Sequence, residues 1–143
     1  MYILGIDPGE LTGFCMLNVR QGVDLLTRPV GAQVDSKHLH NMVHSWIGEA
    51  DVIVVESEVR HGRLTEGKIA QLKVIGVIEY VTRRFGKDII WITPEERKNS
   101  KIEAPDTASV PRPHAQDAYQ LIIAYGIREG LIILDEANTP VTA

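Results

Sequence analysis

The run Val52-Ile53-Val54-Val55 is the feature of this sequence that most narrows its fold. Four consecutive β-branched residues favour a strand, and a strand without polar alternation is apolar on both faces. Such a strand is typical of the parallel centre of a sheet that helices cover on both sides. The run ends at Glu56, so a carboxylate closes a buried strand.

The other elements agree with one mixed sheet flanked by helices. In chain order we first expect an antiparallel meander of strands at 2–6, 11–19 and 23–30, and then a helix after an N-cap at Ser36. The strand at 52–55 follows, and after it come a helix over 65–85 ended by Gly86 and a strand at 89–92. A proline-containing loop over 99–113 leads to a helix over 114–129 ended by Gly130. Gly13 in the second strand allows close approach of another backbone. This order predicts an α/β fold with a five-stranded sheet, three antiparallel strands and then parallel ones. We expect one domain over residues 1–134 and a frayed tail over 135–143.

The composition sets the broad class of protein. The chain has 143 residues, of which 44% are hydrophobic and 24% charged, as in an ordinary soluble domain rather than a disordered or coiled-coil chain. No apolar run reaches the roughly 20 residues of a membrane helix, and no basic segment precedes the apolar N-terminus as in a signal peptide. The single cysteine, Cys15, cannot form an internal disulfide and is expected in the core. These features predict a cytoplasmic protein.

The charge distribution bears on the choice of partner. The net charge is −4, which argues against nucleic acid. However, 11 of the 15 basic residues lie within residues 60–112, where they can form a local positive patch. A solvated surface of mixed charge explains the same pattern.

Three acidic residues lie where structural elements end or begin. Asp7 follows the first strand, Glu56 follows the buried run, and Asp117 opens the last helix one turn after His114. Carboxylates that converge repel one another, by about 4 kcal/mol at 4 Å and an effective dielectric constant near 20. A divalent cation such as Mg²⁺ or Mn²⁺ relieves this repulsion, and two such ions can catalyse phosphodiester hydrolysis.

Each acidic residue also has a simpler interpretation. Asp7 before Pro8-Gly9 can shape a turn, Glu56 can be the first solvated residue after a strand, and Asp117 can interact with the helix dipole. Only their joint placement at element ends favours a site. His38, His40 and His44 are expected on the surface, because no carboxylate or cysteine completes a ligand set beside them.

Several motifs resemble those of the RuvC-type Holliday junction resolvases. The similarity extends over roughly residues 2–126, and it is carried by Ile3-Leu4-Gly5-Ile6-Asp7-Pro8-Gly9 with Gly13-Phe14, by Val54-Val55-Glu56, by Lys68, Gln71 and Gly76-Val77, and by His114-Ala115-Gln116-Asp117-Ala118. The resemblance implies an RNase H-like fold and a homodimeric, Mg²⁺-dependent endonuclease of DNA recombination and repair. Such an enzyme nicks two strands of a four-way DNA junction symmetrically and leaves 5′-phosphate and 3′-hydroxyl ends. The small size fits a compact phage-type or organellar member of the family, and the expected place of action is the cytoplasm, as a nucleoid-associated protein or a phage-encoded protein in a bacterial host.

The resemblance also implies roles for individual residues. Asp7 would bridge two Mg²⁺ ions, and Glu56, His114 and Asp117 would hold one ion each, with Mn²⁺ as a possible substitute. His114 replaces a carboxylate by an imidazole, so metal should bind less well as this histidine protonates. Lys98 aligns with a family lysine near the scissile phosphate, although it also fits an exposed charged run at 95–98.

Two departures from the family pattern leave the substrate open. The segment 57–61 lacks the aromatic residue that wedges into the junction centre, and the stretch between Lys98 and His114 is too short for an additional helix. An RNase H-like nuclease of flaps, forks or RNA–DNA hybrids, or a non-catalytic junction-binding module, is therefore an alternative. Asp7-x-Gly9 also resembles a phosphate-binding loop of actin-like proteins, but those proteins need two lobes.

The residues after Glu56 provide candidates for DNA and subunit contacts. We expect Arg60, Arg63, Lys68 and Lys73 to bind phosphates of branched DNA. One face of the helix at 65–85 is predicted to pack on the sheet, namely that with Ala70, Val74, Val77, Ile78, Val81 and Phe85. Ile69, Leu72 and Gly76 lie on another side. This side can meet a second copy of the chain or another part of the same domain.

Overall fold

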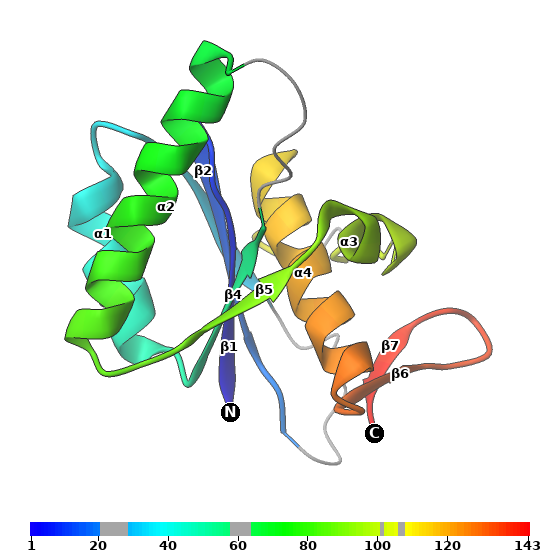
Figure 1. Ribbon diagram of the computed structural model, residues 1–143. Coiled ribbons are helices and arrows are strands. Elements are labelled where there is room, and N and C mark those ends of the chain that lie inside the picture. Colours follow the sequence, from blue (N-terminus) through cyan, green and yellow to red (C-terminus); the bar gives the residue numbers. More distant parts are fainter. Residues whose placement is uncertain (21–28, 58–63, 101, 106–107) are drawn as a thin grey trace.

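The computed structural model describes residues 1–20, 29–57, 64–100, 102–105 and 108–143, and it contains a five-stranded mixed sheet (Figure 1). The strand order is β3-β2-β1-β4-β5, with β1 at Tyr2–Asp7, β2 at Leu11–Asn18, β3 at Val30–Asp35, β4 at Val52–Glu56 and β5 at Ile89–Ile92. The pairs β1–β2 and β2–β3 are antiparallel, whereas β1–β4 and β4–β5 are parallel. The predicted RNase H-like sheet is confirmed.

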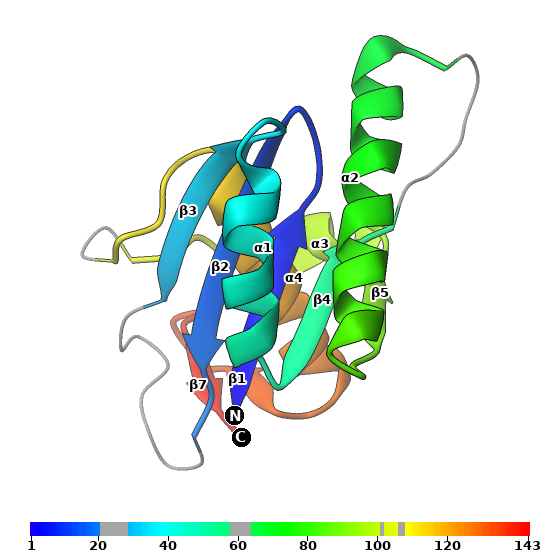
Figure 2. The same ribbon diagram turned by 90° about the vertical axis from the view of Figure 1, so that its left-hand side faces the viewer.

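Helices cover both faces of this sheet. Helices α1 (Leu39–Glu49) and α2 (Glu66–Arg84) lie on one face, and α3 (Pro94–Ser100) and α4 (His114–Arg128) lie on the other. Figure 2 shows α1 and α2 in front of the sheet and α4 behind it. Of the residues described, none belongs to a helix long and apolar enough to cross a membrane.

The position of β4 between two helical layers explains why its sequence is apolar throughout, which is the pattern from which the strand was predicted. Ile53 and Val55 belong to the core beneath α1 and α2, and Val54 belongs to the core beneath α4. All three side chains are fully buried. Because successive side chains of a strand point to opposite faces, a strand between two helical layers has to be apolar at every position.

Glycines at two strand positions let α4 lie directly on the sheet. A Cβ atom at Gly5 would collide with the backbone carbonyl of Ala118, and one at Gly13 would collide with that of His114. The close approach predicted at Gly13 is therefore confirmed. It brings the first turn of α4 to the end of β1, where Asp7 lies.

The predicted ends of the two longest helices agree with the structure. The hydroxyl of Thr65 accepts a hydrogen bond from the backbone N–H of Lys68, at 3.3 Å, and so caps α2. Gly86 and Gly130 have φ angles of 66° and 70° after α2 and α4, a conformation that glycine adopts without strain. On α2, Val74, Ile78 and Val81 are buried as expected, whereas Phe85, the residue that follows the helix, is exposed.

The third strand and the first helix begin later than predicted. The strand runs over Val30–Asp35 rather than 23–30, and residues 23–28 lie outside the described part of the chain. Gly31 lies just beyond the predicted end of the strand at residue 30. In the structure, residues 30–35 pair with residues 11–16 of β2. Ser36 is not the N-cap of α1, because the helix begins at Leu39 after an uncapped His38.

Two further predictions are wrong for local reasons: the loop expected over 99–113 begins only after Ser100, and the tail expected to fray over 135–143 contains a strand. Residues Pro94–Ser100 form the short helix α3, where a capping box joins Thr93 and Glu96: the backbone N–H of Glu96 donates to the Thr93 hydroxyl at 3.2 Å, and that of Thr93 donates to Glu96 Oε1 at 3.4 Å. The tail does not fray at residues 140–142. Strand β7 (Pro140–Thr142) pairs with β6 (Ile132–Leu134), because Asp135 Oδ1 accepts two backbone N–H groups of the connecting turn.

Candidate active site

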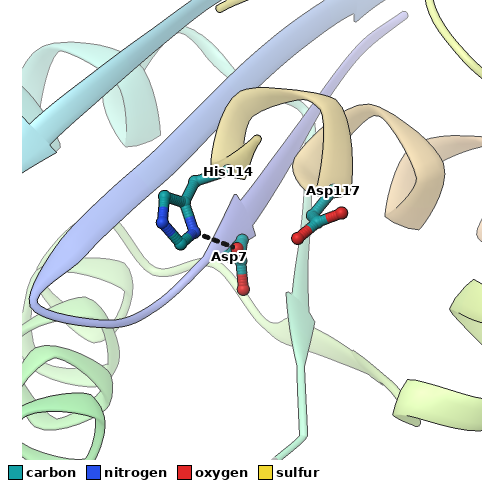
Figure 3. A group of neighbouring side chains, drawn as sticks. All are labelled: Asp7, His114 and Asp117. Carbon is teal, nitrogen blue, oxygen red and sulfur yellow. Dashed lines mark hydrogen bonds and ion pairs between the residues drawn. The ribbon is translucent and has the colours of Figure 1, made fainter. Parts of the chain in front are cut away.

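Three predicted site residues lie together at one end of the sheet (Figure 3). Asp7, His114 and Asp117 each offer a ligand atom, and these atoms all lie within 4.8 Å of one another. Asp7 is the last residue of β1, and the other two lie one turn apart in the first turn of α4. The i, i+3 spacing places both α4 side chains on the same side of the helix, which faces the end of β1.

The start of α4 is fixed from a neighbouring strand. The backbone N–H of His114 donates to the side-chain oxygen of Gln33 in β3, at 2.7 Å. The ring atom Nδ1 of His114 lies 3.1 Å from Oδ2 of Asp7. Backbone and side chain of His114 therefore each have a partner in the sheet, and both partners orient its imidazole toward Asp7.

Glu56 approaches the same site from β4. Strands β1 and β4 are parallel neighbours, so their carboxyl ends meet at the same edge of the sheet. Glu56 lies outside the group of three ligand atoms and is buried. Its Oε2 accepts a hydrogen bond from Nε of Arg97 at 2.8 Å, and Nη1 of Arg97 donates to Oδ1 of Asp117 at 3.0 Å.

The electrostatics of the site reflect this crowding of negative charge. Burial raises the pKa of Asp7 to about 6; the hydrogen bond with His114 opposes this shift, and the charges of Glu56 and Asp117 add to it. Burial also raises the pKa of Glu56, against the lowering effect of Arg97. Both carboxylates therefore ionise less readily than in water, and a nearby cation would favour their charged forms.

The donor set suits a hard divalent cation. Asp7 and Asp117 offer carboxylate oxygens at short range, His114 offers a ring nitrogen, and Glu56 lies beside them. Oxygen ligands with one imidazole are compatible with Mg²⁺ and Mn²⁺. The raised pKa of Asp7 is the electrostatic cost that a bound cation removes. The residues present thus fit a divalent metal.

The basic residue in direct contact with the acidic residues, Arg97, was not predicted from the sequence. Arg97 lies in the charged run at 95–98, and nothing in that run distinguishes it from Lys98. In the structure Lys98 is exposed on α3, close enough for its charge to lower the pKa of Glu56. Arg97 instead contacts Glu56 and Asp117 directly. The capping box at Thr93 and Glu96 was the signal that could have revealed the helix that presents it.

The predicted DNA-binding residues are only partly described. Arg60 and Arg63 lie outside the described residues. Lys68 lies in the first turn of α2, and Lys73 is exposed one turn later. Figure 1 shows that α2 begins at the same end of the molecule as α4. Lys68 therefore lies at the end of the fold that carries the acidic residues, and Lys73 lies in the half of α2 nearer to that end.

Comparison with known proteins identifies the fold. No model of a known protein family matches the sequence, and no curated protein sequence matches it significantly. Among solved structures, Thermus thermophilus RuvC matches at a TM-score of 0.63 and 18% identity, with 100% of both chains covered. RuvC of the same organism in complex with a Holliday junction substrate matches at a TM-score of 0.62 and 17% identity, covering 100% of this chain and 99% of that one. The chain therefore has a RuvC-type fold.

Proposed function

We propose that this protein is a divalent-metal-dependent endonuclease that resolves four-way DNA junctions. The observation that carries the proposal is the meeting of Asp7, His114 and Asp117, with Glu56 beside them, at the carboxyl ends of β1 and β4. These residues come from positions far apart in the sequence, and their mutual repulsion is tolerated in a site that takes up cations. The RuvC-type fold supports the same conclusion.

The four residues divide the work of phosphodiester hydrolysis by position. Two bound divalent ions would supply an activated water molecule and stabilise the leaving oxygen. Asp7, the most central of the acidic residues, would contact both ions. His114 and Asp117 would add ligands from α4 on one side, and Glu56 would add one from β4 on the other. The products would carry 5′-phosphate and 3′-hydroxyl ends.

The proposed substrate is branched DNA. One of the structural neighbours is a RuvC bound to a Holliday junction substrate, and this chain has basic side chains on the part of α2 nearest the acidic end. Lys73 is exposed there, and Arg60, Arg63 and Lys68 complete the proposed phosphate-binding set. Because the bound DNA is the chromosome or a recombination intermediate, we place the protein in the cytoplasm, in DNA recombination and repair. Lys98 would lie near the scissile phosphate.

A homodimer would place two such sites on one junction. The side of α2 that does not pack on the sheet bears Ile69 and Tyr80, which are 42% and 61% exposed. Gly76 lies between them along the helix, and a Cβ there would meet no atom within 4 Å. Ile69 also lines a groove of about 440 Å³ beside α1. Exposed apolar side chains around a glycine suit close packing of a second α2 helix.

A cleavage assay tests the function directly. The protein is incubated with an immobile junction, a mobile junction, a flap, a fork, an RNA–DNA hybrid and a plain duplex, each with Mg²⁺, with Mn²⁺ and with a chelator. We expect paired symmetric nicks in the junctions only, and only with metal. Preferential cutting of flaps, forks or RNA–DNA hybrids would show that one of these, and not the four-way junction, is the substrate. Junction binding without any cutting would identify a non-catalytic binding module. Asp7→Asn is the matched control, which should bind the junction without cutting it.

A further inference from the structure

Arg97 places a positive charge between two of the acidic residues. Its Nε lies 2.8 Å from Oε2 of Glu56, and its Nη1 lies 3.0 Å from Oδ1 of Asp117 and 3.0 Å from Oε1 of Gln120. The side chain of Arg97 is only 14% exposed. The guanidinium thus joins the end of β4 to the first turns of α4.

This position has a direct electrostatic consequence. A guanidinium remains protonated under all ordinary conditions and bridges carboxylates through its planar set of donors. The same oxygen atoms of Glu56 and Asp117 cannot accept these bonds and also bind a metal ion at full strength. Asp7 and His114, by contrast, have no contact with Arg97 among the hydrogen bonds of the described residues. The guanidinium therefore contacts two of the four candidate ligands, Glu56 and Asp117, and leaves Asp7 and His114 to each other.

We propose that Arg97 is a positioning residue, a tethered internal cation that holds Glu56 and Asp117 in the metal-free protein and competes with divalent ions for these two carboxylates. The inference rests on the proposed function, because it takes the acidic residues to be metal ligands. It adds a regulatory property, because a divalent ion that binds at Glu56 and Asp117 has to displace the guanidinium of the same chain. When metal is scarce, Arg97 compensates the charge of the site.

The surroundings of Arg97 are suited to such an exchange. Arg97 is presented by α3, a helix of seven residues of which none is buried, so the side chain can move without opening the core. Gln120 lies one turn beyond Asp117 on α4 and accepts from the same Nη1 atom. Its amide oxygen is uncharged, so it can keep a hydrogen bond with the guanidinium after both carboxylates have been released.

Because of this competition, a substitution of Arg97 should raise the affinity for metal and lower the stability of the metal-free protein. Arg97→Gln removes the competing charge, so we expect Mn²⁺ to bind about tenfold more tightly, the effect of one nearby unit charge on an ionic equilibrium. The same substitution leaves Glu56 and Asp117 without their cation, so the melting temperature in chelator should fall. Because a ligand stabilises a protein more when it binds more tightly, added Mn²⁺ should raise the melting temperature of the variant more than that of the wild type. A merely structural role would lower the stability without tightening the binding.

Arg128→Gln is the matched control. Arg128 also joins α3 to its neighbours, with Nη1 3.4 Å from Oε2 of Glu96 and 3.4 Å from the carbonyl of Trp91. It is an arginine at the same interface, but its bonds do not involve Glu56 or Asp117. We expect its loss to leave the Mn²⁺ affinity within twofold of the wild-type value, as for a contact that does not touch the site.

The experiment measures Mn²⁺ binding by electron paramagnetic resonance of the free ion, and thermal unfolding with Mn²⁺ or chelator, on the full chain without DNA. Arg97→Lys is included in case Arg97→Gln does not fold. It keeps one charge but loses the fork that bridges both carboxylates, and it should bind Mn²⁺ about threefold more tightly than the wild type. Equal or weaker binding by the folded Arg97 variants overturns the inference while leaving the proposed nuclease intact. Absence of Mn²⁺ binding by the wild type and all variants overturns the metal site itself.

Discussion

His114 Nδ1 lies 3.1 Å from Asp7 Oδ2, although the two residues are 107 positions apart in the chain. The contact joins the end of β1 to the first turn of α4, and Asp117 approaches the same carboxylate from one turn further along the helix. Burial at this junction and the neighbouring negative charges make the ionised form of Asp7 costly. The site is therefore under electrostatic strain that a cation relieves, and this property can be measured without a substrate.

The first prediction concerns the pH dependence of stability in the metal-free protein. The pKa of Asp7 is raised from 3.8 to about 6 in the folded state, so folding favours its protonated form. The stability associated with that form is present below pH 3.8 and is lost as the pH rises through about 6. Asp7→Asn cannot ionise. We expect the variant to gain free energy of unfolding relative to the wild type between pH 4 and pH 7.5, by up to about 3 kcal/mol.

Urea denaturation in chelator at both pH values measures this difference. The comparison of two proteins that differ only at Asp7 cancels the titration of every group that does not interact with Asp7. Added Mg²⁺ should reverse the order at pH 7.5, because the wild type alone gains a full ligand set. A stability difference that stays constant with pH would contradict the raised pKa of Asp7.

The second prediction concerns the contact between α4 and the sheet. A Cβ at Gly13 would collide with the backbone of His114 and Ala115, and neither backbone can move without shifting the candidate ligands. Gly13→Ala should lower the free energy of unfolding by about 1–3 kcal/mol, as overpacking of a core does, and should weaken Mn²⁺ binding. Gly67→Ala is the control, since a Cβ there meets only the Thr65 hydroxyl at 3.9 Å. This exposed helical site should be neutral or slightly stabilised. If both variants behaved alike, the close contact at Gly13 would not be needed for the site.

The sequence predicted those parts of the fold whose signals are local. The apolar run before Glu56 predicted the buried parallel strand, and the glycines at 86 and 130 predicted the ends of two helices. The positions of Asp7 and Asp117 at element ends were enough to expect them to converge, because strand ends and helix starts can lie along one edge of a sheet, whereas His114 was expected in the site only from the family resemblance. Apart from that of His114, these predictions required only the spacing of apolar residues and the positions of helix-ending glycines and strand ends along the chain.

The parts that were missed depend on contacts between distant residues. The edge strand β3 contains Gly31, which reads as a breaker, and its existence depends on pairing with β2. Arg97 was hidden in a charged run, because which of its neighbouring cations points inward is decided by how α3 packs against α4. Charge alone cannot separate a residue that bridges two carboxylates from one that is solvated.

The third prediction concerns DNA binding by α2. Lys73 is exposed, and we expect Lys73→Gln to weaken binding to all DNA structures and to reduce the slope of log affinity against log salt by about 1. Arg84→Gln removes an exposed charge at the opposite end of the same helix and should leave the slope unchanged. Fluorescence anisotropy with a labelled junction over a range of salt concentrations gives both slopes. Equal slopes for wild type and Lys73→Gln would remove this lysine from the DNA interface.

The last prediction concerns the oligomeric state. Ile69 is 42% exposed on the side of α2 that does not face the sheet, and an apolar side chain buried between two copies would not tolerate a charge. We expect light scattering at micromolar concentration to give twice the chain mass of 15.9 kDa for the wild type and the chain mass for Ile69→Glu. Ile133→Glu, at a 52% exposed position on β6, should remain dimeric. Since each copy carries its own acidic site, the Ile69→Glu protein should nick single strands of a junction but lose the pairing of its two cuts. A wild-type protein of one chain mass that still makes paired cuts would show that the second α2 helix is not the partner.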